Sequence, residues 1–107
     1  MRNEYQADPP SPSSDLVEVR RLVTRGLQGY RARLFLFGSW ATGNAGLTSD
    51  IDVAVMPIDP IPREVLSDIR EALEESLVVC PVDLVDLSEA SDDFRQRILR
   101  EGVPWND

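Results

Sequence analysis

The chain has 107 residues, of which 42% are hydrophobic and 28% are charged, and this length accommodates one domain with a single modest core. Its formal net charge of −8 disfavours direct binding to the phosphate backbone of DNA or RNA and suits a basic protein partner or solubility. No run approaches the roughly 18 apolar residues that span a membrane. No apolar leader is visible at the N-terminus, so a cytoplasmic protein is expected.

The composition also excludes several kinds of chemistry. Histidine is absent, which excludes serine–histidine and cysteine–histidine mechanisms and conventional zinc sites. All eleven basic residues are arginine, which excludes lysine Schiff bases and the P-loop lysine. The single cysteine, Cys80, cannot form an internal disulfide and is interpreted as a small core residue.

The first part of the chain predicts a tail followed by a helix. Residues 1–14 are polar and contain three prolines, which predicts a disordered tail before one domain over residues 15–107. Ser14 or Asp15 can cap a helix that runs to about Gln28. The apolar stripe of this helix has helical spacing and consists of Leu16, Val19, Leu22, Val23 and Leu27.

Three apolar runs then predict buried strands, over residues 33–37, 51–56 and 82–87. A short helical turn is expected over residues 39–42. The segment 103–105 is expected to add a short edge strand.

Two further helices complete the expected order. Pro62 is suited to the first position of a helix that ends near Ser76. Ser88 or Ser91 can cap a last helix that ends near Glu101. The apolar positions expected to face inward are Val65, Leu66, Ile69, Leu73 and Leu77 in the first of these helices, and Phe94, Ile98 and Leu99 in the second. The order α-β-(short α)-β-α-β-α predicts an α/β (α+β) fold, a small mixed sheet packed by helices.

The most informative segment is GSWATGNAGLTSDID, residues 38–52. A Gly-Ser turn that leads into a helix start offers backbone N–H groups and a hydroxyl to phosphate. Asp50 and Asp52 are two residues apart, so on a strand they point to one face and can hold a divalent metal. The spacing does not fit a Walker A loop, an EF-hand or a dinucleotide-binding fingerprint.

The carboxylates in the strands are harder to explain structurally than the turn is. Gly38 alone could be a strand-ending turn, and Ser39 alone a helix cap. Asp52 and Asp83, however, stand between apolar neighbours within predicted strands, where a carboxylate is costly unless it is paired or bound to metal. A single site that both carboxylates share is a simpler explanation than two unrelated buried carboxylates.

These motifs resemble the signature of the DNA polymerase β-like nucleotidyltransferases. That signature is a Gly-Ser turn, ten intervening residues and an Asp-x-Asp followed by an apolar strand, as in GSWATGNAGLTSDIDVAV here. The chain is most similar to the smallest members, the minimal nucleotidyltransferases (MNT). VDLVDL, at the third strand, and the closing REGVPW also resemble that family. The resemblance covers about 70 residues, from Leu34 to Trp105.

The resemblance implies a site for nucleotide and metal. Asp50 and Asp52 would hold two Mg²⁺ ions that clamp the α-phosphate of ATP and the leaving pyrophosphate. Gly38 and Ser39 would hold the β- and γ-phosphates, and Ser49 is also assigned to nucleotide binding.

A third carboxylate would bind the catalytic metal and help to deprotonate the attacking hydroxyl. Asp83 matches the position that the resemblance implies. Asp86, three residues further on, would point to the opposite face of a regular strand. Both faces of this strand are expected to be buried, so Asp86 stays open as the alternative.

The chain departs from the family pattern next to the Gly-Ser turn. Trp40 and Thr42 stand where family members carry arginines that neutralise triphosphate charge. Trp40 is expected either to stack on a base or partner or to plug into the core. Arg33 and Arg63 are the candidates to replace the missing triphosphate contacts.

The expected function is Mg²⁺-dependent transfer of AMP from ATP to a protein hydroxyl. A stand-alone catalytic core, with nothing after Asp107, is expected to borrow its acceptor surface from a separately encoded protein. The resemblance implies that this partner is a HEPN ribonuclease toxin, modified on a tyrosine, and that the chain is its antitoxin in a hetero-oligomer. Two alternatives remain: an MNT-fold antitoxin that neutralises by binding alone, and a nucleotidyltransferase acting on a small molecule such as an aminoglycoside.

Overall fold

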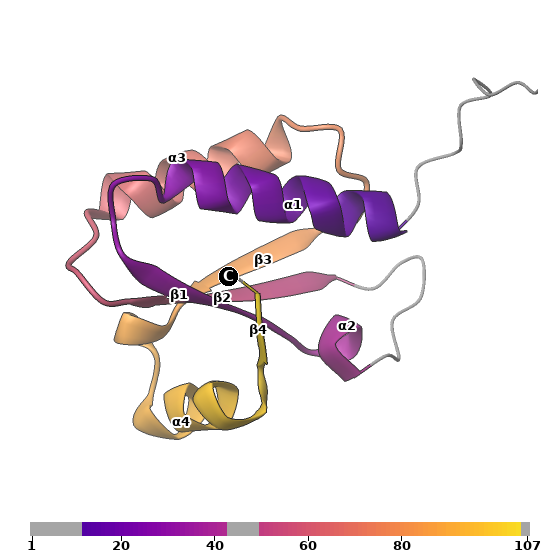
Figure 1. Cartoon of the computed structure of the whole chain (residues 1–107). Helices are drawn as coiled ribbons and strands as arrows, with labels where there is room; N and C mark the ends of the chain where they lie inside the picture. Colours follow the sequence, from indigo (N-terminus) through magenta and orange to yellow (C-terminus); the bar gives the residue numbers. More distant parts are fainter. Residues whose placement is uncertain (1–11, 43–49, 106–107) are drawn as a thin grey trace, which may run out of the picture.

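The structure is a computed structural model that describes residues 12–42 and 50–105. Four strands form one mixed sheet in the order β3-β2-β1-β4. Helices α1 and α3 cover one face of this sheet, and α4 lies against the other (Figure 1). The small mixed sheet packed by helices that the sequence predicts is therefore confirmed.

The elements occur in the expected order, with a short 3-10 helix, η1, added before the last helix. Their bounds are α1 Pro12–Gly26, β1 Ala32–Phe37, α2 Ser39–Thr42, β2 Ile51–Pro57, α3 Arg63–Glu74, β3 Val82–Asp86, η1 Leu87–Glu89, α4 Asp92–Glu101 and β4 Val103–Pro104. Among the described residues, no helix has the length and apolar character needed to cross a membrane.

The larger part of the core lies between the sheet and the pair α1 and α3. Alternate residues of the strands point to this side, because successive side chains of a strand face opposite ways. The buried members of this cluster are Val19, Val23, Leu27, Leu34, Leu36, Ile51, Val53, Val55, Leu66, Ile69, Leu73, Cys80 and Leu84. The interpretation of Cys80 as a core residue is thus confirmed.

Two boundaries differ from the sequence-based expectation. Helix α1 begins at Pro12, upstream of the expected cap, because proline is tolerated in the first turn of a helix; residues 12–14 are therefore helical. Leu77 does not face inward as expected: it is 94% exposed. Helix α3 ends at Glu74, so Leu77 lies beyond the helix and does not share its buried face.

The smaller part of the core lies between the sheet and α4. Phe35, Ala54, Leu87 and Ile98 are buried there. Of the two serines expected to cap the last helix, Ser91 does so: its hydroxyl accepts a hydrogen bond from the backbone N–H of Phe94 at 3.2 Å.

The sheet register places the motif segments next to one another. β1 and β2 are antiparallel, with Phe37 opposite Asp52. β2 and β3 are parallel, with Asp52 beside Asp83. Because paired residues in neighbouring strands project to the same face, the three side chains form a row across the sheet.

Candidate functional site

The row formed by Phe37, Asp52 and Asp83 lies on the face of the sheet that α4 partly covers. Ala54, two residues after Asp52, is buried in the α4-side core, and side chains two apart in a strand share a face. Asp52 is half-buried, whereas Asp83 is exposed at the outer strand of the sheet. Two carboxylates from different strands therefore meet on one surface.

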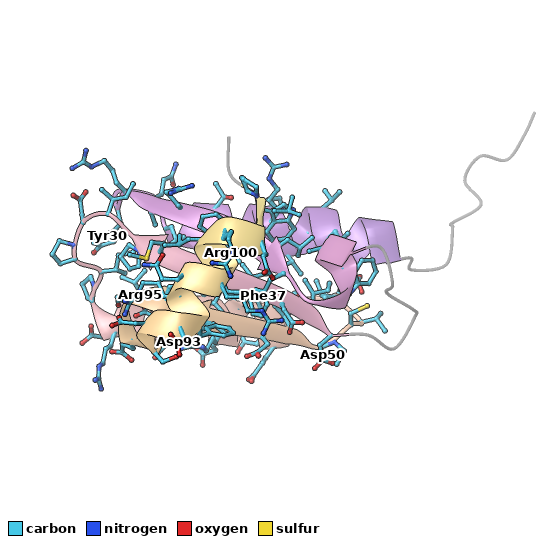
Figure 2. The ribbon with its side chains drawn as sticks, turned by 90° about the horizontal axis from the view of Figure 1, so that it is seen from below. Tyr30, Phe37, Asp50, Asp93, Arg95 and Arg100 are labelled. Atoms are coloured by element: carbon cyan, nitrogen blue, oxygen red, sulfur yellow. The ribbon has the colours of Figure 1, made fainter. Side chains whose placement is uncertain are left out.

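Asp50 lies immediately before β2 and is exposed. Seen from the α4 side, it stands at the end of the sheet, beyond the helix (Figure 2). The structure thus brings Asp52 and Asp83 to one face of the sheet and places Asp50 at the same end. This end is also where β1 leads into the Gly38 turn.

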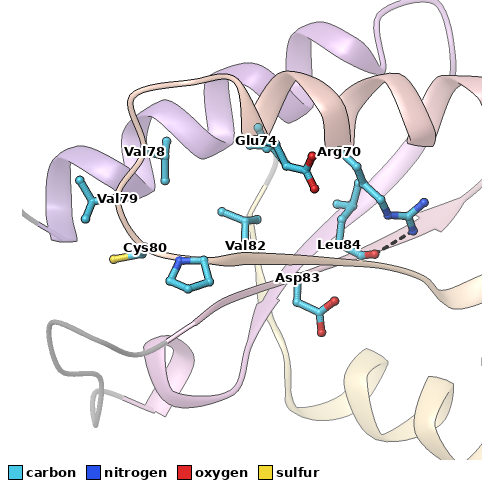
Figure 3. A pocket seen from close by; sticks show the side chains of 10 residues that line it. Arg70, Glu74, Val78, Val79, Cys80, Val82, Asp83 and Leu84 are labelled. Atoms are coloured by element: carbon cyan, nitrogen blue, oxygen red, sulfur yellow. Dashed lines mark hydrogen bonds between the residues drawn. The ribbon is translucent and has the colours of Figure 1, made fainter.

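Asp83 and Asp86 lie in different surroundings. The carboxylate of Asp83 points away from α3, to the side of β3 where α4 lies (Figure 3). Asp86 instead accepts hydrogen bonds from the backbone N–H of Ser88 at 2.9 Å and from its hydroxyl at 2.6 Å. Asp86 therefore caps η1, and it faces away from Asp52.

Gly38 is required by the close approach of Asp52 to the turn. Its φ is +74°, in the left-handed region that disfavours side chains. A Cβ at this position would also collide with Oδ2 of Asp52. The turn and the central carboxylate are thus packed directly against each other, and only glycine permits this arrangement.

Burial and neighbouring charges act in the same direction on Asp52. Partial burial raises the pKa of Asp52 above its usual range, and repulsion from Asp83 and then from Asp50 raises it further. A raised carboxylate pKa means that the charged form is disfavoured where it stands. A cation placed among these carboxylates would favour the charged form of Asp52.

The donor set fits magnesium in kind. Carboxylate oxygens are the protein ligands that Mg²⁺ prefers, and the missing Cβ of Gly38 leaves the space in which the carboxylate of Asp52 lies. Within residues 12–42 and 50–105, no three acidic or cysteine side chains converge closely enough to form a complete metal site by themselves. A metal ion bound to the described carboxylates would therefore need further ligands from water or from the bound phosphates.

Other predicted site residues are placed only in part. Ser49 lies outside the described residues, and of Ser39 the structure describes only the backbone, at the start of α2. Trp40 is half-buried and packs against the larger core cluster, which agrees with the core-plug interpretation.

Neither of the two arginines expected to replace the missing triphosphate contacts lies at this end of the sheet. Arg33 is near the start of β1 and pairs with Met56 at the end of β2, whereas Gly38 follows the opposite end of β1. Arg63 begins α3 and forms an ion pair with Glu89 at 3.6 Å.

Sequence reasoning missed a pocket that borders the Gly38 turn. It has a volume of about 320 Å³ and lies where α4 approaches the end of β1. Its lining consists of Phe37, Gly38, Ala41, Phe94, Arg97, Ile98, Glu101 and Gly102. No local pattern in the sequence indicates it, because its two walls are more than fifty residues apart in the chain.

A second pocket, of about 280 Å³, lies between α3 and β3. Arg70 donates a hydrogen bond to the carbonyl oxygen of Leu84 at 2.9 Å there (Figure 3). Asp83 contributes to its rim, but the carboxylate points to the other side of the strand. This pocket is therefore separate from the carboxylate row.

Comparisons with known proteins agree with this geometry. Residues 31–104 match the family described as polymerase beta, nucleotidyltransferase. A protein of Haemophilus influenzae named "probable protein adenylyltransferase MntA" is 31% identical over 88 residues, which cover 82% of this chain and 75% of that protein.

Two solved structures extend the likeness to the fold. A crystal structure of a toxin–antitoxin with AMP-PNP contains a chain that is 28% identical, with a TM-score of 0.63 over 81% of this chain and 72% of that one. A structure described as a minimal nucleotidyltransferase is also 28% identical, with a TM-score of 0.66 over 88% of this chain and 99% of that one.

Proposed function

This chain belongs to the polymerase beta family of nucleotidyltransferases, and we propose that it transfers AMP from ATP to a hydroxyl of a partner protein. The observation that carries the proposal is the pairing of Asp52 with Asp83 on one face of the sheet, directly against the Gly38 turn. Carboxylates beside a turn with exposed backbone suit phosphoryl chemistry, in which positioning and charge stabilisation supply most of the catalysis.

The turn and the carboxylates have distinct tasks in this proposal. Gly38 and Ser39 bind the β- and γ-phosphates, and Ser49 is a further nucleotide contact. Asp50 and Asp52 face the α-phosphate. The exposed position of Asp83 leaves it accessible to an acceptor hydroxyl that approaches from solvent.

The reaction balances without a further reactant. The acceptor hydroxyl oxygen forms a bond to the α-phosphorus, and the bond from that phosphorus to the oxygen bridging it to the β-phosphate breaks. Pyrophosphate leaves with the electron pair of that bond. Asp83 accepts the hydroxyl proton, as a positioned carboxylate can do in general base catalysis.

Asp50, Asp52 and Asp83 would hold two Mg²⁺ ions. When bound, these ions supply positive charge that offsets the carboxylates and the developing charge on the phosphate oxygens. The raised pKa of Asp52 supports this assignment, because it marks a carboxylate whose charge is not yet compensated.

The proposed acceptor is a tyrosine of a HEPN-type ribonuclease toxin, which makes the chain the antitoxin of the pair. The name of the Haemophilus relative supports a protein acceptor. The toxin–antitoxin structure with AMP-PNP supports both the toxin partner and the adenine nucleotide.

The partner is first identified as the protein that co-purifies with the wild-type chain. It is then co-expressed with either the wild type or Asp52→Asn, and growth of the cells is measured. We expect the wild type to neutralise the partner and Asp52→Asn to fail. Full neutralisation by a well-folded Asp52→Asn would contradict catalysis and support an antitoxin that acts by binding alone.

A further inference from the structure

A nucleoside triphosphate needs cationic partners, and the chain lacks them at the usual place. Trp40 stands at the first of the two positions after the Gly38 turn where family members carry arginine, and its side chain packs against the core. The inference that follows rests on the proposed function, because it asks which side chain meets the triphosphate of the same site.

Most described arginines are placed or engaged elsewhere. Arg31 pairs with Asp59 at 2.8 Å at the far end of β1. Arg95 donates to the carbonyl oxygens of Leu87 and Ala90, each at 3.0 Å, and to Asp92 at 2.6 Å, so it is engaged in fixing the start of α4.

Arg97 is different, because it lines the same pocket as Gly38. Within the described part of the chain it forms an ion pair with Glu101, at 3.5 Å, and both side chains are largely exposed, at 67% and 58%. Such an exposed pair contributes little stability, so the guanidinium can turn to a stronger anionic partner at small cost.

The position of Arg97 against the turn is built into the fold. One helical turn earlier, Phe94 packs edge-on against Phe37, with ring centroids 5.8 Å apart. At the other end of α4, Gly102 passes so close to β1 that a Cβ would lie 3.2 Å from the Cβ of Phe35. Strand β4 then pairs with β1. Helix α4, which lies across this face of the sheet (Figure 2), is therefore held at both ends.

We propose that Arg97 binds the terminal phosphates of the nucleoside triphosphate held at the Gly38 turn, replacing the arginines that the turn itself lacks. The guanidinium suits this role because its planar fork can donate two hydrogen bonds to phosphate oxygens. Contact between Phe37 and Phe94 keeps α4, and with it the guanidinium of Arg97, beside the turn.

The test measures binding of ATP and of AMP by calorimetry, with Mg²⁺, to the complete chain as wild type, Arg97→Ala, Arg97→Lys and Arg100→Ala. Arg100 is the matched control: it is 68% exposed on the same helix and pairs with the same Glu101, at 3.6 Å, but it does not line the pocket. Arg97→Ala should weaken ATP binding roughly ten-fold or more and leave AMP binding unchanged. Arg97→Lys should lie between, and Arg100→Ala should match the wild type.

The outcomes separate this inference from the function on which it rests. Unchanged ATP affinity in Arg97→Ala, or equal weakening for ATP and AMP, would overturn the role of Arg97 and leave the proposed function standing. A wild-type chain that binds no ATP would overturn both.

Discussion

Single residues at the candidate site constrain one another through contact and charge. Gly38 and Asp52 are joined by a steric requirement, since a Cβ on the glycine would occupy the place of the carboxylate. Asp52 is in turn joined to Asp83 by register and by repulsion. A substitution at either position therefore acts on the geometry of the other.

Gly38→Ala should lose stability and activity together. The positive φ adds a penalty of about 1–2 kcal/mol for alanine, and displacement of the Asp52 carboxylate should lower transfer by about 100-fold. Thermal unfolding and initial transfer rates measure the two effects.

Gly29→Ala is the matched control, because Gly29 has φ +95° but a Cβ there would meet no atom within 4 Å. It should share the loss of stability and keep its activity. Equal activity of the two variants would contradict the steric role of Gly38.

Asp52→Asn should raise the melting temperature of the metal-free protein near pH 7. The pKa of Asp52 is raised in the folded state, so above that pKa the folded protein holds a charge less favourably than the unfolded chain does. As the pH falls through the raised pKa, the folded state binds the proton and the difference between variant and wild type should shrink.

The measurement is thermal unfolding with a chelator across the acidic range. A variant that is less stable than the wild type at neutral pH, or a difference that grows as the pH falls, would show that Asp52 is stabilising and not strained.

At the scale of elements, the sequence predicts well what depends on local pattern. The near-continuous apolar runs predicted β1, β2 and β3, and the difference of three residues between Asp83 and Asp86 predicted that they face opposite ways. The side chains that the structure places bear out that parity, since Asp86 caps η1 on the side away from Asp52.

What the sequence could not predict depends on contacts between distant segments. The pocket beside Gly38 arises because α4 is carried back to the end of β1. Leu77 was misplaced because the end of α3 at Glu74 is not marked by a glycine or proline. The role of Asp15 was likewise missed, because its partners lie more than sixty residues away.

Asp15 connects α1 to the loop that leads into β3. It is 5% exposed, and its Oδ2 accepts hydrogen bonds from the backbone N–H groups of Val79 at 3.0 Å and Cys80 at 2.9 Å. Asp15→Ala leaves both donors without this acceptor and should lower the free energy of unfolding by about 2 kcal/mol.

Denaturant unfolding measures this loss, with Asp15→Asn as the control, because its amide oxygen still accepts. Asp15→Asn should retain a large part of the stability. Asp15→Ala with wild-type stability would mean that water replaces the carboxylate without loss.

At the scale of the whole molecule, the two faces of the sheet have different tasks. Helices α1 and α3 cover the face that holds the larger core cluster, and α4 lies against the other face (Figure 1). Asp52 and Asp83 are paired on this second face, and a pocket borders the Gly38 turn beside α4. Binding at the second face should therefore stabilise the fold without rearranging the first.

Mg²⁺ with ATP should raise the melting temperature of the wild type, because a ligand that binds only the folded state stabilises it, by about 2.7 kcal/mol at a concentration 100 times its Kd. Asp52→Asn should respond much less, and removal of the metal with a chelator should abolish the response. Equal shifts for the two proteins would place the binding site elsewhere.

Transfer of AMP to a protein is tested most directly by label transfer in an extract of the source cells with Mg²⁺. The extract is incubated with ATP labelled at the α-phosphate or at the γ-phosphate, and with the wild type or Asp52→Asn. We expect one discrete protein band, labelled only by the wild type and only from the α-phosphate. Two results would contradict protein adenylylation. One is a band that appears only with the wild type and is labelled from the γ-phosphate; the other is no band with a folded wild-type protein in an extract that contains its partner.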